Sequence, residues 1–349
     1  MSQEGCFTRG VSALAVEYPN MNVSIGIGRN TKRNPKKAVR DFAEMIKQDG
    51  IKSEYSEKLL FILISGSMIP NLPGIGEKRV IKTNIPSSIV SRLLKTSMQV
   101  SQKGVGREDK IMEEISRQMP DFNIIGGSSI DDNKMEKNFQ FFNDTIVTNA
   151  VVGLSLETDI SVLMDSQVGV EKTDKIFGVQ TAGEKYLINK IDNKPATKTF
   201  FESLNWPKSL MDESLHRRTF FYPILFEKNE EIFPEVIGVI IGNSIVCGFD
   251  VLSDKLCIGQ SSRKILENAI RKGLQNITRD GIPEFSFIIY CSAFLETLGR
   301  DFFLVQKIIK EAYKDSPFLL ISTGGEDFRI PGKIPKHSNE TINTAAFSQ

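Results

Sequence analysis

The 349-residue sequence lacks an excess of charge of either sign, because 44 lysine and arginine residues nearly balance 43 aspartate and glutamate residues. A near-neutral chain creates no long-range field that attracts nucleic acid or an anionic membrane surface. The sequence also lacks an apolar run close to the roughly 20 residues of a membrane span, and it opens without a signal-peptide pattern. We therefore expect a cytoplasmic protein with no nucleic-acid partner and no membrane association.

Cysteine and histidine are scarce as well. The cysteines are Cys6, Cys247, Cys257 and Cys291. They form no Cys-x-x-Cys pair, so we expect free thiols in a reducing compartment and no structural metal site. With only two histidines, few bases are available to activate a nucleophile, and neither a P-loop nor a Gly-x-Ser-x-Gly motif occurs. These absences predict a protein that is not an enzyme.

The hydrophobic pattern predicts a mixed α/β (α+β) fold of two pseudo-duplicated halves, with mixed sheets covered by helices. In the first half, the predicted strands are 11–16, 23–28, 59–64 and 122–125, and the predicted helices are 35–48, 87–96 and 109–118. In the second half, the predicted helices 261–275 and 302–313 alternate with the predicted strands 285–290 and 317–322. Each half thus has the order helix, buried strand, helix, buried strand, glycine pair.

Further strands and a connector are predicted between these copies. The predicted strands are 139–142, 146–156 and 160–164, the polar connector is 189–198, and a hairpin joins 233–239 to 244–249 around Gly242-Asn243. We place the boundary near residue 190, which gives an N-terminal domain of residues 1–190 and a C-terminal domain of residues 191–349.

A first glycine motif, Gly26-Ile-Gly28, stands between a predicted strand and a predicted helix. Two of the three glycines of a dinucleotide-binding turn are present, but the third glycine is missing. No acidic residue follows convincingly about 20 residues later, where that motif places one. The pattern therefore disfavours phosphate binding at this turn.

The glycine pairs that end a predicted strand in each half are the candidate site. Glycine lets a ligand approach the backbone closely, and nearby polar side chains can donate and accept hydrogen bonds. The predicted ligand-binding residues are Gly126, Gly127, Ser128, Cys291, Thr323, Gly325, Glu326, His337, Asn339 and Thr341. The alternative is a turn in which Glu326 and Asn339 only satisfy backbone amides. Of the two pairs, we expect the second turn to recognise the ligand and Gly126-Gly127 to serve as a backbone platform.

These residues resemble the FIST family, named for F-box and intracellular signal transduction proteins. The C-terminal pattern of the family corresponds to Thr323-Gly-Gly325-Glu326 and His337-Ser-Asn339-Glu-Thr341. The N-terminal pattern is similar to Ile124-Ile-Gly126-Gly127-Ser128-Ser129. The segment from Lys194-Pro-Ala-Thr to Leu204 resembles the entry into the C-terminal domain. The resemblance covers nearly the whole chain.

Two departures from the family pattern stand out. The family often has Cys-x-x-Arg where this chain has Cys291-Ser-Ala-Phe294, and that arginine would suit a ligand that carries a carboxylate. In addition, a serine between His337 and Asn339 shifts the imidazole by one position.

The resemblance implies a stand-alone sensory protein that binds a small polar ligand, such as an amino acid, and signals through a separate protein partner. No cofactor is expected for that function. The first alternative, since some bacterial relatives bind haem, is a haem protein with His216 or His337 as axial ligand. The second alternative is a scaffold that binds partner proteins and no small molecule.

Overall fold

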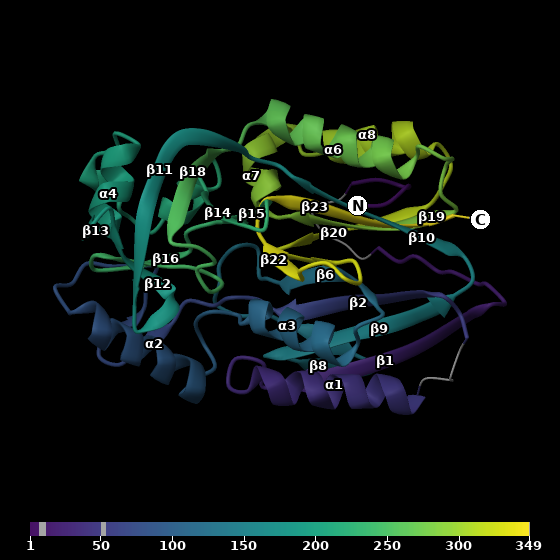
Figure 1. The fold of residues 1–349 in the computed structure, drawn as a ribbon, viewed down its shortest axis with the longest axis horizontal. Helices are drawn as coiled ribbons and strands as arrows, with labels where there is room; N and C mark the ends of the chain where they lie inside the picture. The colour runs from purple at the N-terminus through teal and green to yellow at the C-terminus, as the bar shows by residue number, and fades with distance from the viewer. Residues whose placement is uncertain (7–11, 50–53, 349) are drawn as a thin grey trace.

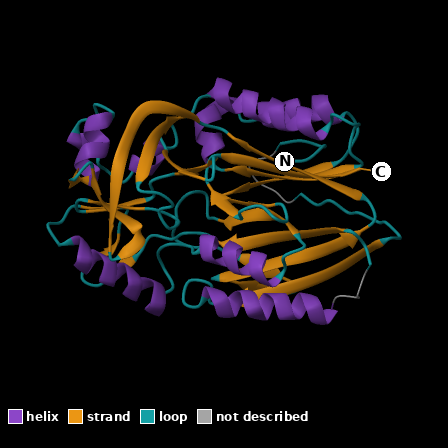
Figure 2. Cartoon of the chain, viewed as in Figure 1, coloured by secondary structure: helices purple, strands orange, loops and turns teal. Residues whose placement is uncertain are grey.

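The computed structural model describes residues 1–6, 12–49 and 54–348. Its main body contains a pair of mixed sheets that lie face to face, and helices cover the outer face of each sheet (Figures 1 and 2). A third sheet lies at one end of this four-layer body, on the left in Figure 1. The predicted mixed α/β class with helix-covered sheets is confirmed.

The first sheet is formed by β1 (Met21–Arg29), β9 (Ala150–Thr158), β2 (Glu57–Ser65), β6 (Asn123–Ser129), β21 (Glu326–Arg329) and β22 (Lys336–Ser338), in that order. Helices α1 (Pro35–Asp49) and α3 (Glu108–Gln118) cover its outer face. The second sheet has the order β10 (Ser161–Val168), β23 (Thr341–Ser348), β19 (Phe285–Cys291) and β20 (Phe318–Thr323). Helices α6 (Arg263–Ile277), α7 (Ala293–Leu298) and α8 (Leu304–Tyr313) cover it, with η2 (Gly299–Asp301) before α8.

The third sheet runs through β15 (Glu231–Glu235), β14 (Ile224–Lys228), β18 (Lys255–Gln260), β11 (Glu171–Ala182), β12 (Glu184–Ile191), β17 (Ser244–Val246), β16 (Val239–Ile241) and β5 (Val80–Ile81). Strand β13 (Lys194–Pro195) pairs with β12 beside this path. Around the sheet lie α2 (Ser87–Val100), α4 (Ala196–Ser203), η1 (Lys208–Leu210) and α5 (Leu215–Thr219). Two small hairpins complete the described elements: β3 (Asn71–Leu72) with β4 (Gly76–Glu77), and β7 (Gln140–Phe142) with β8 (Thr145–Val147).

The apolar run of β2 shows why the body has four layers. Side chains alternate across a strand, so a strand between two covered faces must be apolar at every position. Leu60 and Ile62 pack with α1 and α3, whereas Leu59 and Phe61 pack with residues of the second sheet such as Phe285. The continuous run predicted from sequence therefore fills two cores at once.

The two facing sheets repeat one topology. In the first, β2 is parallel to β6 and antiparallel to β9, which is antiparallel to β1. In the second, β19 is parallel to β20 and antiparallel to β23, which is antiparallel to β10. Helix α1 precedes β2 in the chain as α6 precedes β19. The predicted pseudo-duplication is thus a repeat of strand order.

The repeats are also interwoven. Strands β21 and β22, late in the chain, extend the first sheet, while β10, from the predicted N-terminal domain, forms an edge of the second. Residue 190 lies within β12, which pairs with β11 and β17. The division into domains 1–190 and 191–349 stays a prediction.

Several element predictions need correction. Gly126 and Gly127 lie inside β6 and do not follow it, because β2 and β21 pair with both residues and the pairing with β2 continues to Ser129. Residues 12–16 form no strand, and Val11 lies outside the described residues. The predicted strand 146–156 is divided into β8 and β9, since Asn149 adopts a positive φ of 51°. The connector 189–198 contains the end of β12, all of β13 and the start of α4.

Across residues 1–6, 12–49 and 54–348, none of the helices has both the length and the apolar character that a membrane crossing needs. Within the same residues, histidine, cysteine, aspartate and glutamate side chains do not gather into a group of three that could hold a metal ion.

Candidate functional site

One row of the first sheet ends in a buried ion pair. The register aligns Gly26, Gly153, Ile62, Gly126, Asp327 and His337 from β1 to β22. Asp327 and His337 face each other across β21 and β22, and Nδ1 of His337 lies 2.8 Å from Oδ1 of Asp327. Asp327 is fully buried and His337 is 8% exposed. The pair therefore lies away from solvent, where an unpaired charge would be costly.

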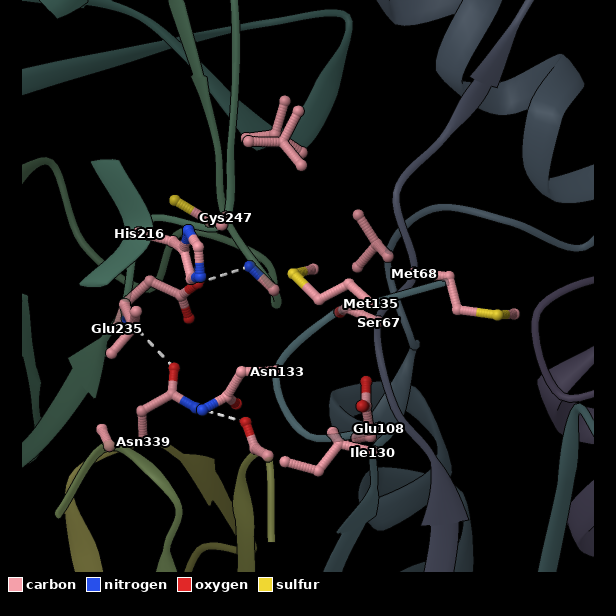
Figure 3. Close-up of a pocket in the computed structure, with 18 of the residues that line it drawn as sticks. Ser67, Met68, Glu108, Ile130, Asn133, Met135, His216, Glu235, Cys247 and Asn339 are labelled. Carbon is pink, nitrogen blue, oxygen red and sulfur yellow. Dashed lines mark hydrogen bonds between the residues drawn. The ribbon is translucent and has the colours of Figure 1, made fainter. Parts of the chain in front are cut away.

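A cavity of about 100 Å³ lies beside this pair, and His337 forms part of its wall. The wall comes from both copies of the repeat and from the third sheet (Figure 3). The loops after β2 and β6 and the start of α3 contribute one side. Helix α5, the segment from β15 to β17, and the ends of β19, β20 and β22 contribute the other. Such enclosed spaces between elements of different regions of a chain are typical ligand sites.

Asn339 joins two regions of this wall. Its side-chain oxygen accepts a hydrogen bond from Val236 N at 3.0 Å, and its amide nitrogen donates to Gly324 O at 2.8 Å. The turn after β20 is thereby fixed to the strand segment that follows β15 (Figure 3). Gly325 allows this close arrangement, since a Cβ at that position would lie 2.6 Å from Cε1 of His337.

The electrostatics of His337 are set by carboxylates. Burial by itself lowers the pKa of the imidazole, but Glu108 and Asp327 more than reverse this effect and raise the pKa to about 10. His337 is therefore an imidazolium at neutral pH. Burial raises the pKa of Asp327, and the imidazolium offsets part of that rise. The two side chains form a charged pair.

Two further carboxyl groups are buried close to Thr341: Glu326 at the start of β21, and Glu340 in the bend between β22 and β23. Glu326 accepts hydrogen bonds from Thr323 Oγ1 at 3.1 Å and from Thr341 Oγ1 at 3.0 Å. Burial raises the pKa of Glu326 to about 8, although the hydrogen bonds from the Thr341 backbone and the two threonine hydroxyls oppose the rise. Burial, with a contribution from Glu326, also raises the pKa of Glu340 well above its ordinary value. With a pKa of about 8, Glu326 is mainly protonated at neutral pH.

The structure places the predicted site residues in two groups. Cys291, His337 and Asn339 line the cavity. Gly126, Gly127, Ser128, Thr323, Gly325, Glu326 and Thr341 are not part of its wall over the described residues. Glu326 instead satisfies the Thr341 backbone amide, as the turn alternative proposed. Ser128 is linked to the wall indirectly, because its hydroxyl donates to Glu108 Oε1 at 2.7 Å.

Two carboxyl groups of the cavity wall, Glu108 and Glu235, were not among the predicted residues. Glu108 is the first residue of α3, one position before the predicted helix start, and its preceding residue Arg107 has a positive φ of 69°. Glu235 interrupts the apolar segment of residues 233–239. An acidic residue within an apolar strand is a signal for a buried functional carboxyl group, and this signal could have identified Glu235.

The relationship to known proteins rests on one comparison. A family model described as the FIST N domain matches residues 1–194, which is more than half of the 349 residues. The chain belongs to the FIST family. FIST domains are sensory domains of signal transduction, so the chain has a sensory role. None of the curated proteins matches its sequence. The predicted C-terminal FIST domain stays a prediction.

The buried Glu326 predicts an unusual pH dependence of stability. Its folded-state pKa of about 8 lies above the roughly 4.3 of an unfolded glutamate. The folded state therefore retains a proton that the unfolded state loses, and the free energy of unfolding should fall as pH rises from about 4.5 to 8. Glutamine mimics the neutral carboxyl group, so Glu326→Gln should make urea denaturation midpoints between pH 5 and pH 8 depend less on pH.

The matched control is Glu44→Gln on the exposed side of α1, which should keep the pH dependence of the wild type. A slope as steep in Glu326→Gln as in the wild type would contradict the prediction. Some slope should remain in the variant, because burial also raises the pKa values of Glu235 and Glu340.

Proposed function

We propose that this FIST protein is an intracellular sensor that binds a small polar molecule in the cavity beside His337 and transmits the signal to a separate protein partner. The observation that carries the proposal is the cavity itself. Segments of both repeats and of the third sheet form its wall, so a ligand there would contact all three. Ligand binding could then change how these segments pack, which is what a sensor requires.

We also propose that the protein binds its ligand without catalysis. Burial raises the pKa values of the Cys247 and Cys291 thiols well above their ordinary range, so neither is a reactive thiolate. The Ser128 hydroxyl donates a hydrogen bond to Glu108. Against the effect of burial, Glu108 and Asp327 raise the pKa of His337 to about 10, so its imidazole is already protonated at neutral pH and cannot take the proton of a nucleophile.

Haem is the second candidate ligand, because both histidines named as axial ligands, His216 and His337, line the same cavity. A space of about 100 Å³ is several times smaller than a porphyrin, however, so the cavity in this structure does not fit haem. Haem reconstitution tests this alternative, because an axial histidine gives a Soret band that should be lost in His216→Ala or His337→Ala. Absence of a Soret band in the wild type would rule haem out.

The proposed partner has a candidate contact surface. On the β7–β8 hairpin, Phe141 and Ile146 face each other in register and are 69% and 65% exposed. Phe139, just before β7, is 51% exposed. Exposed apolar side chains that gather in one place often mark protein interaction sites.

Filling the cavity should abolish ligand binding. Val246 lines the cavity at the end of β17, so Val246→Phe would place a ring in or beside the space that the ligand needs. In differential scanning fluorimetry against a metabolite library, a ligand at 100 times its dissociation constant stabilises the wild type by about 2.7 kcal/mol. We expect this stabilisation in the wild type and not in Val246→Phe.

The control for this experiment is Val179→Phe, in β11 and outside the cavity wall, which should respond to the ligand as the wild type does. The melting temperature of each variant without ligand shows whether it is folded. A library that stabilises none of the folded proteins would contradict the proposed function, as would a ligand that stabilises Val246→Phe and the wild type equally.

A further inference from the structure

Two carboxyl groups enter the cavity from different regions of the chain. Glu108 begins α3, and Glu235 ends β15 (Figure 3). They are 2% and 1% exposed, so water reaches little of either side chain. Both side chains line the same cavity, so a molecule inside it can contact either carboxyl group.

Each of these groups has one satisfied and one unsatisfied oxygen. Oε1 of Glu108 accepts the Ser128 hydroxyl at 2.7 Å, and Oε1 of Glu235 accepts Gly248 N at 2.5 Å. The Oε2 atoms of both residues have no hydrogen-bond partner in the described portion of the chain. A buried oxygen without a donor costs free energy. A ligand with N–H donors would remove that cost at both positions.

The cavity wall offers no free positive charge to these oxygens. Over the described residues the wall contains neither lysine nor arginine. The charge of His337 is already paired with Asp327, and burial lowers the pKa of His216 to about 4, so His216 is neutral. Lys32 interacts with Glu108 at longer range, but its ammonium donates to Ser65 Oγ at 3.0 Å and Gly66 O at 2.8 Å. In the part of the chain that the structure describes, the Oε2 atoms of Glu108 and Glu235 therefore have no lysine or arginine of the cavity wall as a partner.

The rest of the wall is largely apolar. Hydrophobic side chains from several elements face the same space: Met68, Leu94, Val105, Phe220, Val239 and Val246. Since a water needs about 10–15 Å³ of such space, the cavity of about 100 Å³ has room for roughly seven waters or a molecule with a similar number of heavy atoms. The wall suits a short hydrocarbon body better than a strongly polar one.

We propose that the cavity binds a small organic cation, a primary or secondary alkylammonium, whose N–H groups donate to Glu108 and Glu235. Its alkyl body lies against the apolar wall. The proposal rests on the proposed sensory function, because it names the chemical class of the molecule that is sensed. It also departs from the amino acid implied by the family resemblance. A carboxylate would find no arginine in the described wall and would be repelled by Glu108.

The direct test compares four probes of similar size by titration calorimetry and scanning fluorimetry at fixed ionic strength: n-butylammonium chloride, n-butanol, sodium butyrate and 2-aminobutyrate. We expect n-butylammonium to bind and stabilise the wild type more strongly than the other three. Hydrogen bonds to a charged group are worth enough that Glu108→Gln and Glu235→Gln should each weaken n-butylammonium binding at least tenfold. Glu44→Gln, on the exposed face of α1, is the matched control and should bind as the wild type does.

The pH dependence of binding gives a second readout that does not depend on the folding of a variant. Burial raises the pKa of Glu235 to about 8, with His337 and the Gly248 amide lowering it and Glu108 and Asp109 raising it further. At pH 7, Glu235 is therefore protonated in most protein molecules. Binding of a cation to its carboxylate then releases close to one proton. Titrations in two buffers of different ionisation enthalpy measure that proton, and affinity should rise about tenfold from pH 7 to pH 9.

The outcomes separate this inference from the proposed function. The alkylammonium proposal is refuted if butyrate, 2-aminobutyrate or n-butanol binds more strongly than n-butylammonium. It is also refuted if n-butylammonium binds both glutamine variants as it binds the wild type. Either result would leave a ligand-binding cavity in place. Binding of none of the four probes also refutes it. The proposed sensor itself fails if the metabolite library stabilises nothing, or if its ligand stabilises Val246→Phe as much as the wild type.

Discussion

His337→Ala should destabilise the protein by about 3–5 kcal/mol, the cost of removing one partner from a buried ion pair. Nδ1 of His337 lies 2.8 Å from Oδ1 of Asp327, and Asp327 is fully buried. Over the described residues Oδ2 of Asp327 already lacks a hydrogen-bond partner. Without the imidazolium, the carboxyl group would be left both unpaired and uncompensated. Urea denaturation followed by circular dichroism measures the change in the free energy of unfolding.

The double variant Asp327→Asn with His337→Ala separates the ion pair from the loss of packing. Because asparagine carries no charge, the double variant should be more stable than His337→Ala alone, with a coupling free energy above about 1 kcal/mol in the cycle. The comparison variant His216→Ala removes a partly exposed ring that has no ion-pair partner among the described residues, contacts the Glu213 carbonyl and packs edge-on against Phe220, so it should cost about 1 kcal/mol. Equal costs for the two histidine variants would show that the ion pair contributes nothing.

The cost of His337→Ala should also depend on pH. The folded-state pKa of His337 is raised to about 10, above the roughly 6.5 of an unfolded histidine. Its stabilisation is fully present below about pH 6.5 and is lost as pH rises through about 10. The difference in unfolding free energy between wild type and His337→Ala should therefore shrink steadily from pH 7 to pH 10. A constant difference over that range would show that the imidazole is neutral.

Much of the layered fold could be predicted because its signals are local. The apolar run of β2 and the helical spacing of α1 each appear in a few consecutive residues, and both elements form close to the predicted bounds. The repeat of strand order follows from the same local patterns. The interweaving could not be predicted, because no local pattern indicates that β21 pairs with β6, which lies some 200 residues earlier in the chain.

The same limit explains the partial prediction of the site. His337 and Asn339 were identified from residue type beside a glycine turn, and both line the cavity. Glu326 has the same residue type and the same setting, yet its carboxyl group turns to Thr323 and Thr341. Glu108 lines the wall at the start of α3, where the Ser128 hydroxyl of β6 donates to its carboxyl group. Which side chains of a strand face the cavity depends on how distant strands pair, and the sequence contains no local signal for that pairing.

Gly28→Ala should destabilise the protein by about 3 kcal/mol, at the upper end of the range for overpacking. A Cβ at Gly28 would lie 1.8 Å from the carbonyl oxygen of Ala38 in α1, and a Cβ at Gly26 would lie 2.8 Å from the carbonyl oxygen of Phe42. Two glycines that are two residues apart on β1 therefore lie against carbonyl groups that are one helical turn apart on α1. The Gly26-Ile-Gly28 motif lets the helix lie directly against the strand, which explains these glycines without a phosphate.

The obstructing atoms belong to backbone, so no side-chain rotation can relieve the contact. Strand β1 is held by its full pairing with β9, and α1 is held by the apolar residues of its buried face, such as Phe42 and Ile46. The control is Gly178→Ala in β11, where a Cβ would approach Asp192 Oδ1 no closer than 3.4 Å. This control should leave stability unchanged or raise it slightly, because alanine restricts the unfolded chain more than glycine does. Thermal and urea denaturation of the two variants side by side measure the difference, and equal stabilities would mean that α1 does not rest on β1 at Gly28.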